Sequence, residues 1–233
     1  MSAAVQITAA RRAGRDVVVH DWPQDAPSCR RVQLALAERV DTRDDLPRVH
    51  TLGGVDIGFE DGGRVTRAAA VVLDAATLEL RESALARVPT RMPYIPGLLS
   101  FREIPGALAA LEQLSALPDL VLVDGHGIAH PRRLGVATHL GLVTGLPTIG
   151  VAKKRLTGSH DAVPEARGAW TPLVDKGETI GAVLRSRFAV KPIFISSGHR
   201  IGLDSALAWT LAALTRYRLP EPTRAADKLA SNR

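Results

Sequence analysis

The chain has 233 residues, 45% of them hydrophobic, which suffices for one large domain with a substantial core. Its formal net charge of +6 favours polyanionic partners, although arginine-rich proteomes also raise the charge of unrelated proteins. The single cysteine, Cys29, excludes an internal disulfide, and no apolar run reaches the roughly 18 to 20 residues of a membrane span, so we expect a cytoplasmic protein without a membrane partner.

The first part of the chain predicts an extension, a helix and three strands. Residues 1–20 contain arginines but no apolar signal segment, and we expect a flexible extension ahead of one domain over 21–233. Apolar positions among polar ones predict a surface helix over 28–40. Three strands follow, and their short connections favour an antiparallel meander over 49–59, 64–73 and 78–88.

A stiff loop follows the meander. Pro93 and Pro96 fix their own backbone angles and keep the preceding residues extended. Tyr94 and Ile95 therefore occupy a segment that loses little entropy on binding, and an exposed tyrosine here would form a wedge. The alternative is a connection whose tyrosine packs on the core.

The helix after this loop carries an acidic residue close to its start. Ser100 and Glu103 have the spacing of a capping box, while Pro105 is also suited to a first helical turn. Apolar residues at helical spacing predict a helix over 101–117. Glu103 is thus expected near the helix N-terminus, beside the wedge.

The second half of the chain predicts a parallel crossover unit and further β-structure. An apolar strand over 120–125, a helix over 134–144 and a buried strand over 148–151 form the crossover. We expect β-structure over 170–195, followed by helices over 203–217 and 224–229. The order of elements predicts an α/β fold, a single domain whose mixed central sheet is flanked by helices.

Two aspartates lie at or near the ends of buried strands. Asp56 and Asp124 would meet where sites form in open α/β sheets, at the carboxyl ends of the strands. Two neighbouring carboxylates repel unless a cation or a proton intervenes, and carboxylates suit Mg²⁺ or Mn²⁺. The alternative is that each aspartate only caps a turn.

Glycine, histidine and basic residues surround these aspartates in the sequence. The loop after Asp124 contains Gly125, Gly127 and two histidines, and it opens a helix whose N-terminus attracts anions. Lys153 follows the next buried strand, and His199 follows a strand predicted over 192–195. Since no nucleophile elbow, phosphate loop or dinucleotide motif is present, the pattern favours metal-assisted phosphodiester hydrolysis.

Several of these segments resemble the endonuclease V family of deoxyinosine-specific DNA repair nucleases. The resemblance runs from about residue 26 to residue 229, in the family's order. The matching motifs are Gly54-Val55-Asp56, Pro93-Tyr94-Ile95-Pro96-Gly97-Leu98-Leu99-Ser100-Phe101-Arg102-Glu103, Val123-Asp124-Gly125-His126-Gly127-Ile128-Ala129-His130-Pro131-Arg132, Gly150-Val151-Ala152-Lys153, Gly198-His199-Arg200 and Arg218-Leu219-Pro220-Glu221-Pro222-Thr223-Arg224.

The resemblance implies a ribonuclease-H-like fold and Mg²⁺-dependent incision of deoxyinosine-containing DNA, with Mn²⁺ able to substitute. The cut would fall at the second phosphodiester on the 3′ side of the lesion and leave 3′-hydroxyl and 5′-phosphate ends. Asp56, Asp124 and Glu103 resemble the metal ligands. His199 resembles a further catalytic residue near the metal, and Lys153 would contact phosphate.

The resemblance also implies how the lesion is received. Tyr94 would separate the strands, supported by Pro93, Ile95 and Pro96. The glycine-rich loop would receive the flipped base, and its pocket residues would be Gly125, Gly127 and His130. The role of His126 stays open.

Two other readings compete with this one. The same fold could act on inosine-containing RNA or on branched or mismatched DNA, since tolerance of ribose depends on the surroundings of the 2′ position. Alternatively, the chain could be a basic nucleic-acid-binding module with structural carboxylates. We expect a monomer in each case.

Overall fold

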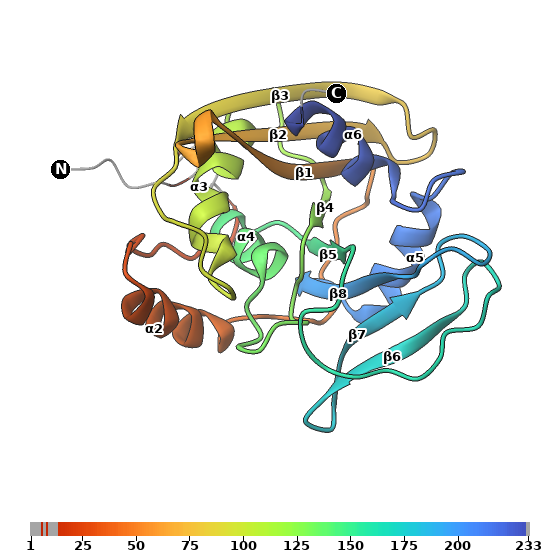
Figure 1. The fold of residues 1–233 in the computed structure, drawn as a ribbon. Coiled ribbons are helices and arrows are strands. Elements are labelled where there is room, and N and C mark those ends of the chain that lie inside the picture. Colours follow the sequence, from red (N-terminus) through yellow and green to blue (C-terminus); the bar gives the residue numbers. More distant parts are fainter. Residues whose placement is uncertain (1–5, 7, 9–13, 232–233) are drawn as a thin grey trace.

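An eight-stranded sheet, with strand order β3-β2-β1-β4-β5-β8-β7-β6, organises the computed structural model, which describes residues 6, 8 and 14–231 (Figure 1). The strands are β1 (Thr51–Glu60), β2 (Val65–Asp74), β3 (Leu80–Pro89), β4 (Leu120–Asp124), β5 (Thr148–Ala152), β6 (Trp170–Asp175), β7 (Glu178–Leu184) and β8 (Ile193–His199). The helices are α2 (Ala26–Ala37), the short η1 (Asp61–Gly63), α3 (Leu99–Leu111), α4 (Val136–Thr144), α5 (Leu203–Ala212) and α6 (Glu221–Ala230).

The sheet is mixed, as predicted. Strands β1, β2 and β3 form the expected antiparallel meander, and β1, β4 and β5 run parallel. Strand β8 then returns antiparallel to β5 and continues through β7 to β6. The α/β prediction with a central mixed sheet flanked by helices is therefore confirmed. None of the helices within the described residues is long and apolar enough to cross a membrane.

Alternating side chains of β4 reach both faces of the sheet. Val121 and Val123 lie in the core that α3 and α4 cover. Leu120 and Leu122 lie in the core on the other face, which α5 covers. A central strand covered on both sides explains the unbroken apolar run of this segment.

Two glycines of β1 allow α6 to lie directly on the strand, as the close approach of the two elements in Figure 1 illustrates. A Cβ at Gly54 would lie 2.0 Å from the carbonyl oxygen of Pro222, and one at Gly58 would lie 2.6 Å from that of Ala230. Asp56 lies between these glycines and, by strand alternation, on the same face. The start and the end of α6 therefore rest on either side of Asp56.

The predicted capping box is wrong. Leu98 is the N-cap of α3 and makes no side-chain capping bond, and Pro105 lies inside the helix. Ser100 instead points its hydroxyl at the buried ring of His139, with Oγ and Nδ1 3.0 Å apart. The helix also ends at Leu111, well before residue 117. The chain turns after Leu111, and the backbone N–H of Ser115 then donates to the carboxylate of Glu82.

The domain begins earlier than residue 21. The backbone N–H of Val18 donates to the carbonyl of Leu142 at 2.8 Å. The rings of His20 and His139 have their Nε2 atoms 2.7 Å apart, and Trp22 stacks on His139. Residues 17–20, the last part of the expected extension, thus contact α4 and the adjoining core. Residues 1–5, 7 and 9–13 of that extension lie outside the described residues.

Candidate active site

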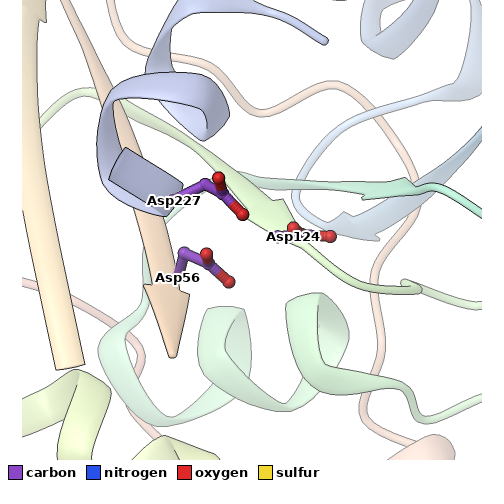
Figure 2. A group of neighbouring side chains, drawn as sticks. All are labelled: Asp56, Asp124 and Asp227. Atoms are coloured by element: carbon purple, nitrogen blue, oxygen red, sulfur yellow. The ribbon is translucent and has the colours of Figure 1, made fainter. Parts of the chain in front are cut away.

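Three aspartates converge at one edge of the sheet. Strands β1 and β4 are parallel, and Val55 is the register partner of Val123, so the residues that follow them, Asp56 and Asp124, are neighbours. Helix α6 adds Asp227 from above, and Figure 2 shows the three carboxyl groups facing a common space. One carboxylate oxygen from each of the three lies within 4.8 Å of the others.

Glu103 extends this cluster from α3. Its side chain is buried, and burial, with Asp56 and Asp124 nearby, raises its pKa to about 8. Burial and the charge of Asp124 likewise raise the pKa of Asp56 to about 7. Both shifts have the same cause, because water is removed from several acids that share one small volume.

Lys153 places a cation beside the acids. Its Nζ lies 2.5 Å from Oδ2 of Asp124 and 3.2 Å from Oδ1 of Asp227. Burial opposes the charged form of this lysine, but the two carboxylates outweigh that effect and raise its pKa. The guanidinium of Arg218 donates to the carbonyl of Lys153 at 2.9 Å, which anchors the backbone at the end of β5.

The donor set fits a hard divalent cation. Four carboxyl groups at this edge, namely those of Asp56, Glu103, Asp124 and Asp227, offer only oxygen ligands, which Mg²⁺ and Mn²⁺ prefer. A single lysine does not balance four acids, and the raised pKa values of Asp56 and Glu103 express the remaining repulsion. The structure thus brings together all three predicted metal ligands and Lys153.

The predicted wedge loop is held at its base and exposed at its tip. Ile95 packs against the buried cluster that contains Met92 and Leu98. Tyr94 is 64% exposed, and its neighbours Pro93 and Pro96 are exposed as well. The alternative in which the tyrosine packs on the core is therefore excluded by the structure.

A small pocket opens beside this loop, with a volume of about 120 Å³. It lies next to the carboxylates, because Gly125 directly follows Asp124 and Ser100 lies one helical turn before Glu103. Its lining combines the wedge loop, the start of α3, the loop after β4 and parts of α2, and consists of Gln33, Tyr94, Gly97, Leu99, Ser100, Gly125, His126, His130, Leu134, Gly135, Val136 and Leu156.

Of the three predicted pocket residues, Gly125 and His130 line the pocket, but Gly127 does not. Gly127 packs against β8 instead: a Cβ at this position would lie 2.0 Å from the carbonyl oxygen of Ser197, and its N–H donates to the hydroxyl of Ser196. Its role is to let the loop approach β8 closely.

Both histidines of this loop are neutral near pH 7. Burial lowers the pKa of His126 to about 4, and burial together with nearby Arg132 lowers the pKa of His130 to about 4. Nε2 of His126 lies 3.0 Å from the carbonyl of Lys154, while its Nδ1 is buried without a hydrogen-bond partner among the described residues. His126 therefore links the pocket to the segment that carries Lys153.

The structure does not bring His199 to the carboxylates. Strand β8 extends through His199, and because it is antiparallel to β5, His199 pairs with Thr148, at the start of β5. Ala152, the residue before Lys153, lies about 13 Å further along that strand at roughly 3.3 Å per residue. Nδ1 of His199 accepts the backbone N–H of Asp41. The predicted position near the metal is therefore wrong.

Asp227 is the residue that sequence reasoning missed. It lies in the middle of a helix, three residues after the motif that ends at Arg224, and no strand end or glycine turn marks it. The available signal was the glycine spacing of β1, in which Gly54 and Gly58 flank Asp56 on the face that receives α6.

A mixed sheet of this order, with carboxylates gathered beside the paired strands β1 and β4, is the architecture of a metal-dependent nuclease with a ribonuclease-H-like fold. The family model described as Endonuclease V matches residues 34–228. Endonuclease V of Azotobacter vinelandii is 58% identical over 213 residues, covering 91% of this chain and 96% of that protein. The chain belongs to the endonuclease V family, and it is a nuclease.

Solved structures agree with this assignment. The crystal structure of endonuclease V from Streptomyces avermitilis has a TM-score of 0.86 at 45% identity, covering 99% of this chain and 97% of that one. Endonuclease V of Ciona intestinalis, in complex with DNA containing an inosine followed by a ribo-adenosine, has a TM-score of 0.77 at 26% identity, covering 88% and 95%. The reading as a binding module with structural carboxylates is therefore wrong.

Proposed function

We propose that this nuclease recognises deoxyinosine in DNA and hydrolyses the second phosphodiester on its 3′ side, with Mg²⁺ as the cofactor and Mn²⁺ as a substitute. The observation that carries the proposal is the adjacency of the carboxylate cluster, a small pocket and an exposed tyrosine on a stiff loop. The Ciona relative bound to inosine-containing DNA supports the substrate class. The protein acts as a cytoplasmic monomer in this proposal.

The carboxylates provide the hydrolytic chemistry. Asp56, Asp124, Asp227 and Glu103 would hold the cation, which when bound activates water and stabilises the leaving 3′ oxygen. Lys153 reaches the same space and binds a phosphate oxygen at the cut. Once a phosphate draws the ammonium away, the oxygens of Asp124 and Asp227 are free to act as ligands.

The pocket and the wedge provide lesion recognition. Extruding a base costs a few kcal/mol and costs least for a mispaired base such as hypoxanthine. Tyr94 occupies the gap in the stack, while the pocket beside Gly125 and His130 receives the extruded base. A neutral His130 adds no charge to the pocket, which suits an uncharged heterocycle.

The direct test is a nicking assay on an end-labelled duplex that contains one deoxyinosine, beside a matched adenine control. We expect a single cut at the second phosphodiester 3′ of the lesion with Mg²⁺ or Mn²⁺, no cut in EDTA and no cut in the control duplex. Equal cutting of both duplexes would refute lesion recognition, and cutting in EDTA would refute the metal requirement.

Replacing Tyr94 with alanine is expected to reduce cleavage of the deoxyinosine duplex by roughly tenfold or more, because a stacked aromatic ring contributes about 1 to 3 kcal/mol per base. The melting temperature should stay nearly unchanged, because the ring is 64% exposed. Tyr94→Phe keeps the ring and should cleave like wild type. A Tyr94→Ala variant with unchanged cleavage would remove the wedge from the proposal.

Inosine-containing RNA is the second candidate substrate. The ribo-adenosine after the inosine in the Ciona complex shows that one relative binds a ribonucleotide at that position. Running the same assay with inosine-containing RNA of identical sequence measures the preference. We expect the DNA to be cut faster, and a faster cut in RNA would reverse the assignment of the substrate.

A further inference from the structure

Gln33 is a buried amide at the edge of the base pocket, on a helix that contributes no carboxylate to the site. It lies in α2, is 1% exposed and lines the pocket. A glutamine side chain is rarely buried to this degree unless its amide is fully used in hydrogen bonds. Both ends of this amide contact the segments that form the pocket.

The amide of Gln33 joins two of these segments. Its Nε2 donates to the carbonyl of Gly97 at 2.9 Å and to that of Leu134 at 3.2 Å. Its Oε1 accepts from Nε of Arg132 at 2.6 Å. One side chain thus connects the wedge loop to Arg132 and Leu134, which lie in the segment between His130 and the start of α4.

The Gly97 carbonyl is the point at which these contacts meet. Besides Gln33, Nη2 of Arg132 donates to it at 2.7 Å, and Nε2 of His130 lies 3.2 Å from it. The backbone N–H of Arg132 donates to Nδ1 of His130, so the ring proton must reside on Nε2 and point at the same carbonyl. Three donors therefore hold one peptide oxygen.

This peptide lies at the exit of the wedge loop. Gly97 has a φ of +75°, and a Cβ there would lie 2.8 Å from Nη2 of Arg132. The N–H of Leu98 donates to the carbonyl of Ile95, which closes the turn directly behind Tyr94. The orientation of the Gly97 peptide therefore determines where the turn that presents Tyr94 leaves the protein surface.

We propose that Gln33 is a positioning residue that holds the Tyr94 loop and the wall of the base pocket in their binding geometry before DNA arrives. This inference rests on the proposed function, because it assigns the loop and the pocket to lesion binding. A loop that is ordered in advance loses less conformational entropy on binding, so loosening it should weaken productive binding more than it slows the chemistry.

Two variants test the role of the amide. Gln33→Leu removes all three hydrogen bonds, while Gln33→Glu keeps the acceptor for Arg132 and loses both donors. Gln113→Leu, at an exposed glutamine beyond α3, is the matched control. If Gln33→Leu fails to fold, Gln33→Glu still tests the donors to the carbonyls of Gly97 and Leu134.

The first readout is hydrogen–deuterium exchange of the free protein, which does not depend on activity. We expect faster exchange over residues 94–98 in both Gln33 variants and unchanged exchange in β4 and α4. The second readout is steady-state nicking, in which KM for a deoxyinosine duplex should rise roughly tenfold, while kcat stays close to wild type. The rise should be smaller on single-stranded deoxyinosine DNA, which needs no strand separation.

The outcomes separate the two claims. Wild-type exchange over 94–98 in a folded Gln33 variant, or equal KM effects on duplex and single strand, would overturn the positioning role. If wild type cleaves no deoxyinosine substrate, the proposed function fails, while the exchange experiment still decides whether Gln33 orders the loop.

Discussion

The Asp56→Asn variant is expected to lose cleavage and, without metal, to become more stable than wild type at pH 8. The loss should reach about a thousandfold, since a metal ligand contributes several kcal/mol and each 1.4 kcal/mol is about tenfold in rate. The gain in stability arises because the substitution removes a charge that the folded protein disfavours. Burial and the neighbouring charge of Asp124 both destabilise the ionised Asp56 carboxylate.

The pH dependence follows from the direction of this shift. The pKa of Asp56 rises from 3.8 in the unfolded chain to about 7 in the folded protein, so the folded state holds this proton more tightly. The stabilisation that the bound proton provides is fully present below the unfolded pKa. That contribution is lost as the pH rises through about 7. Asparagine does not ionise, so the free energy of unfolding of the variant should exceed that of wild type by on the order of 2 kcal/mol at pH 8. At pH 4 the two should be almost equal.

Thermal unfolding in EDTA at pH 4 and pH 8, and again with Mg²⁺ at pH 8, measures both effects. Mg²⁺ should raise the melting temperature of wild type more than that of Asp56→Asn, which reduces the difference between their melting temperatures at pH 8. Asp161→Asn, at an exposed aspartate, is the control. Cleavage by Asp56→Asn at the wild-type rate would contradict its role as a metal ligand. Lower stability than wild type in EDTA at pH 8 would contradict the predicted destabilisation by the Asp56 charge.

The second large effect contrasts Asp227 with His199. Asp227→Asn should reduce cleavage by roughly a hundredfold or more, because its carboxylate lies within 4.8 Å of those of Asp56 and Asp124. His199→Gln should cleave within about twofold of wild type, since its ring lies at the opposite end of β5 and accepts a backbone N–H of Asp41.

Single-turnover nicking of the deoxyinosine duplex measures both variants, and thermal unfolding shows that each is folded. Single-turnover conditions report the chemical step without product release. A large loss in folded His199→Gln, together with wild-type cleavage by Asp227→Asn, would return the catalytic role to the histidine and exclude α6 from the site.

Much of the candidate site could be predicted because its signals are local. Asp56 follows the buried first half of β1 and Asp124 ends β4, and the parallel pairing of these two strands places the aspartates side by side. The two prolines around Tyr94 stiffen their own segment whatever the remaining chain does. Glu103 lies near the start of α3, as its spacing from the Pro93–Pro96 loop indicates, even though the predicted capping box is absent.

The errors have a common physical origin. The side-chain pattern of a strand indicates which faces are buried, but not whether the strand runs parallel or antiparallel to its neighbour. The antiparallel direction of β8, which places His199 at the opposite end of β5 from the carboxylates, could therefore not be inferred. Ser100 has the spacing of a capping residue, but its hydroxyl instead contacts the buried ring of His139, which is distant in sequence.

The residue pattern alone determined the class of fold, the positions of Asp56, Asp124 and Lys153 beside buried strands, and the stiff loop of Tyr94, because periodicity and backbone restriction act over a few residues. The place of Glu103 in the carboxylate cluster came only from the resemblance to the family. Only the tertiary structure decided that Asp227 completes the carboxylate cluster and that Gln33 holds the Gly97 peptide. Both contacts join segments far apart in the chain, and whether such groups meet depends on how α2 and α6 pack rather than on any local pattern.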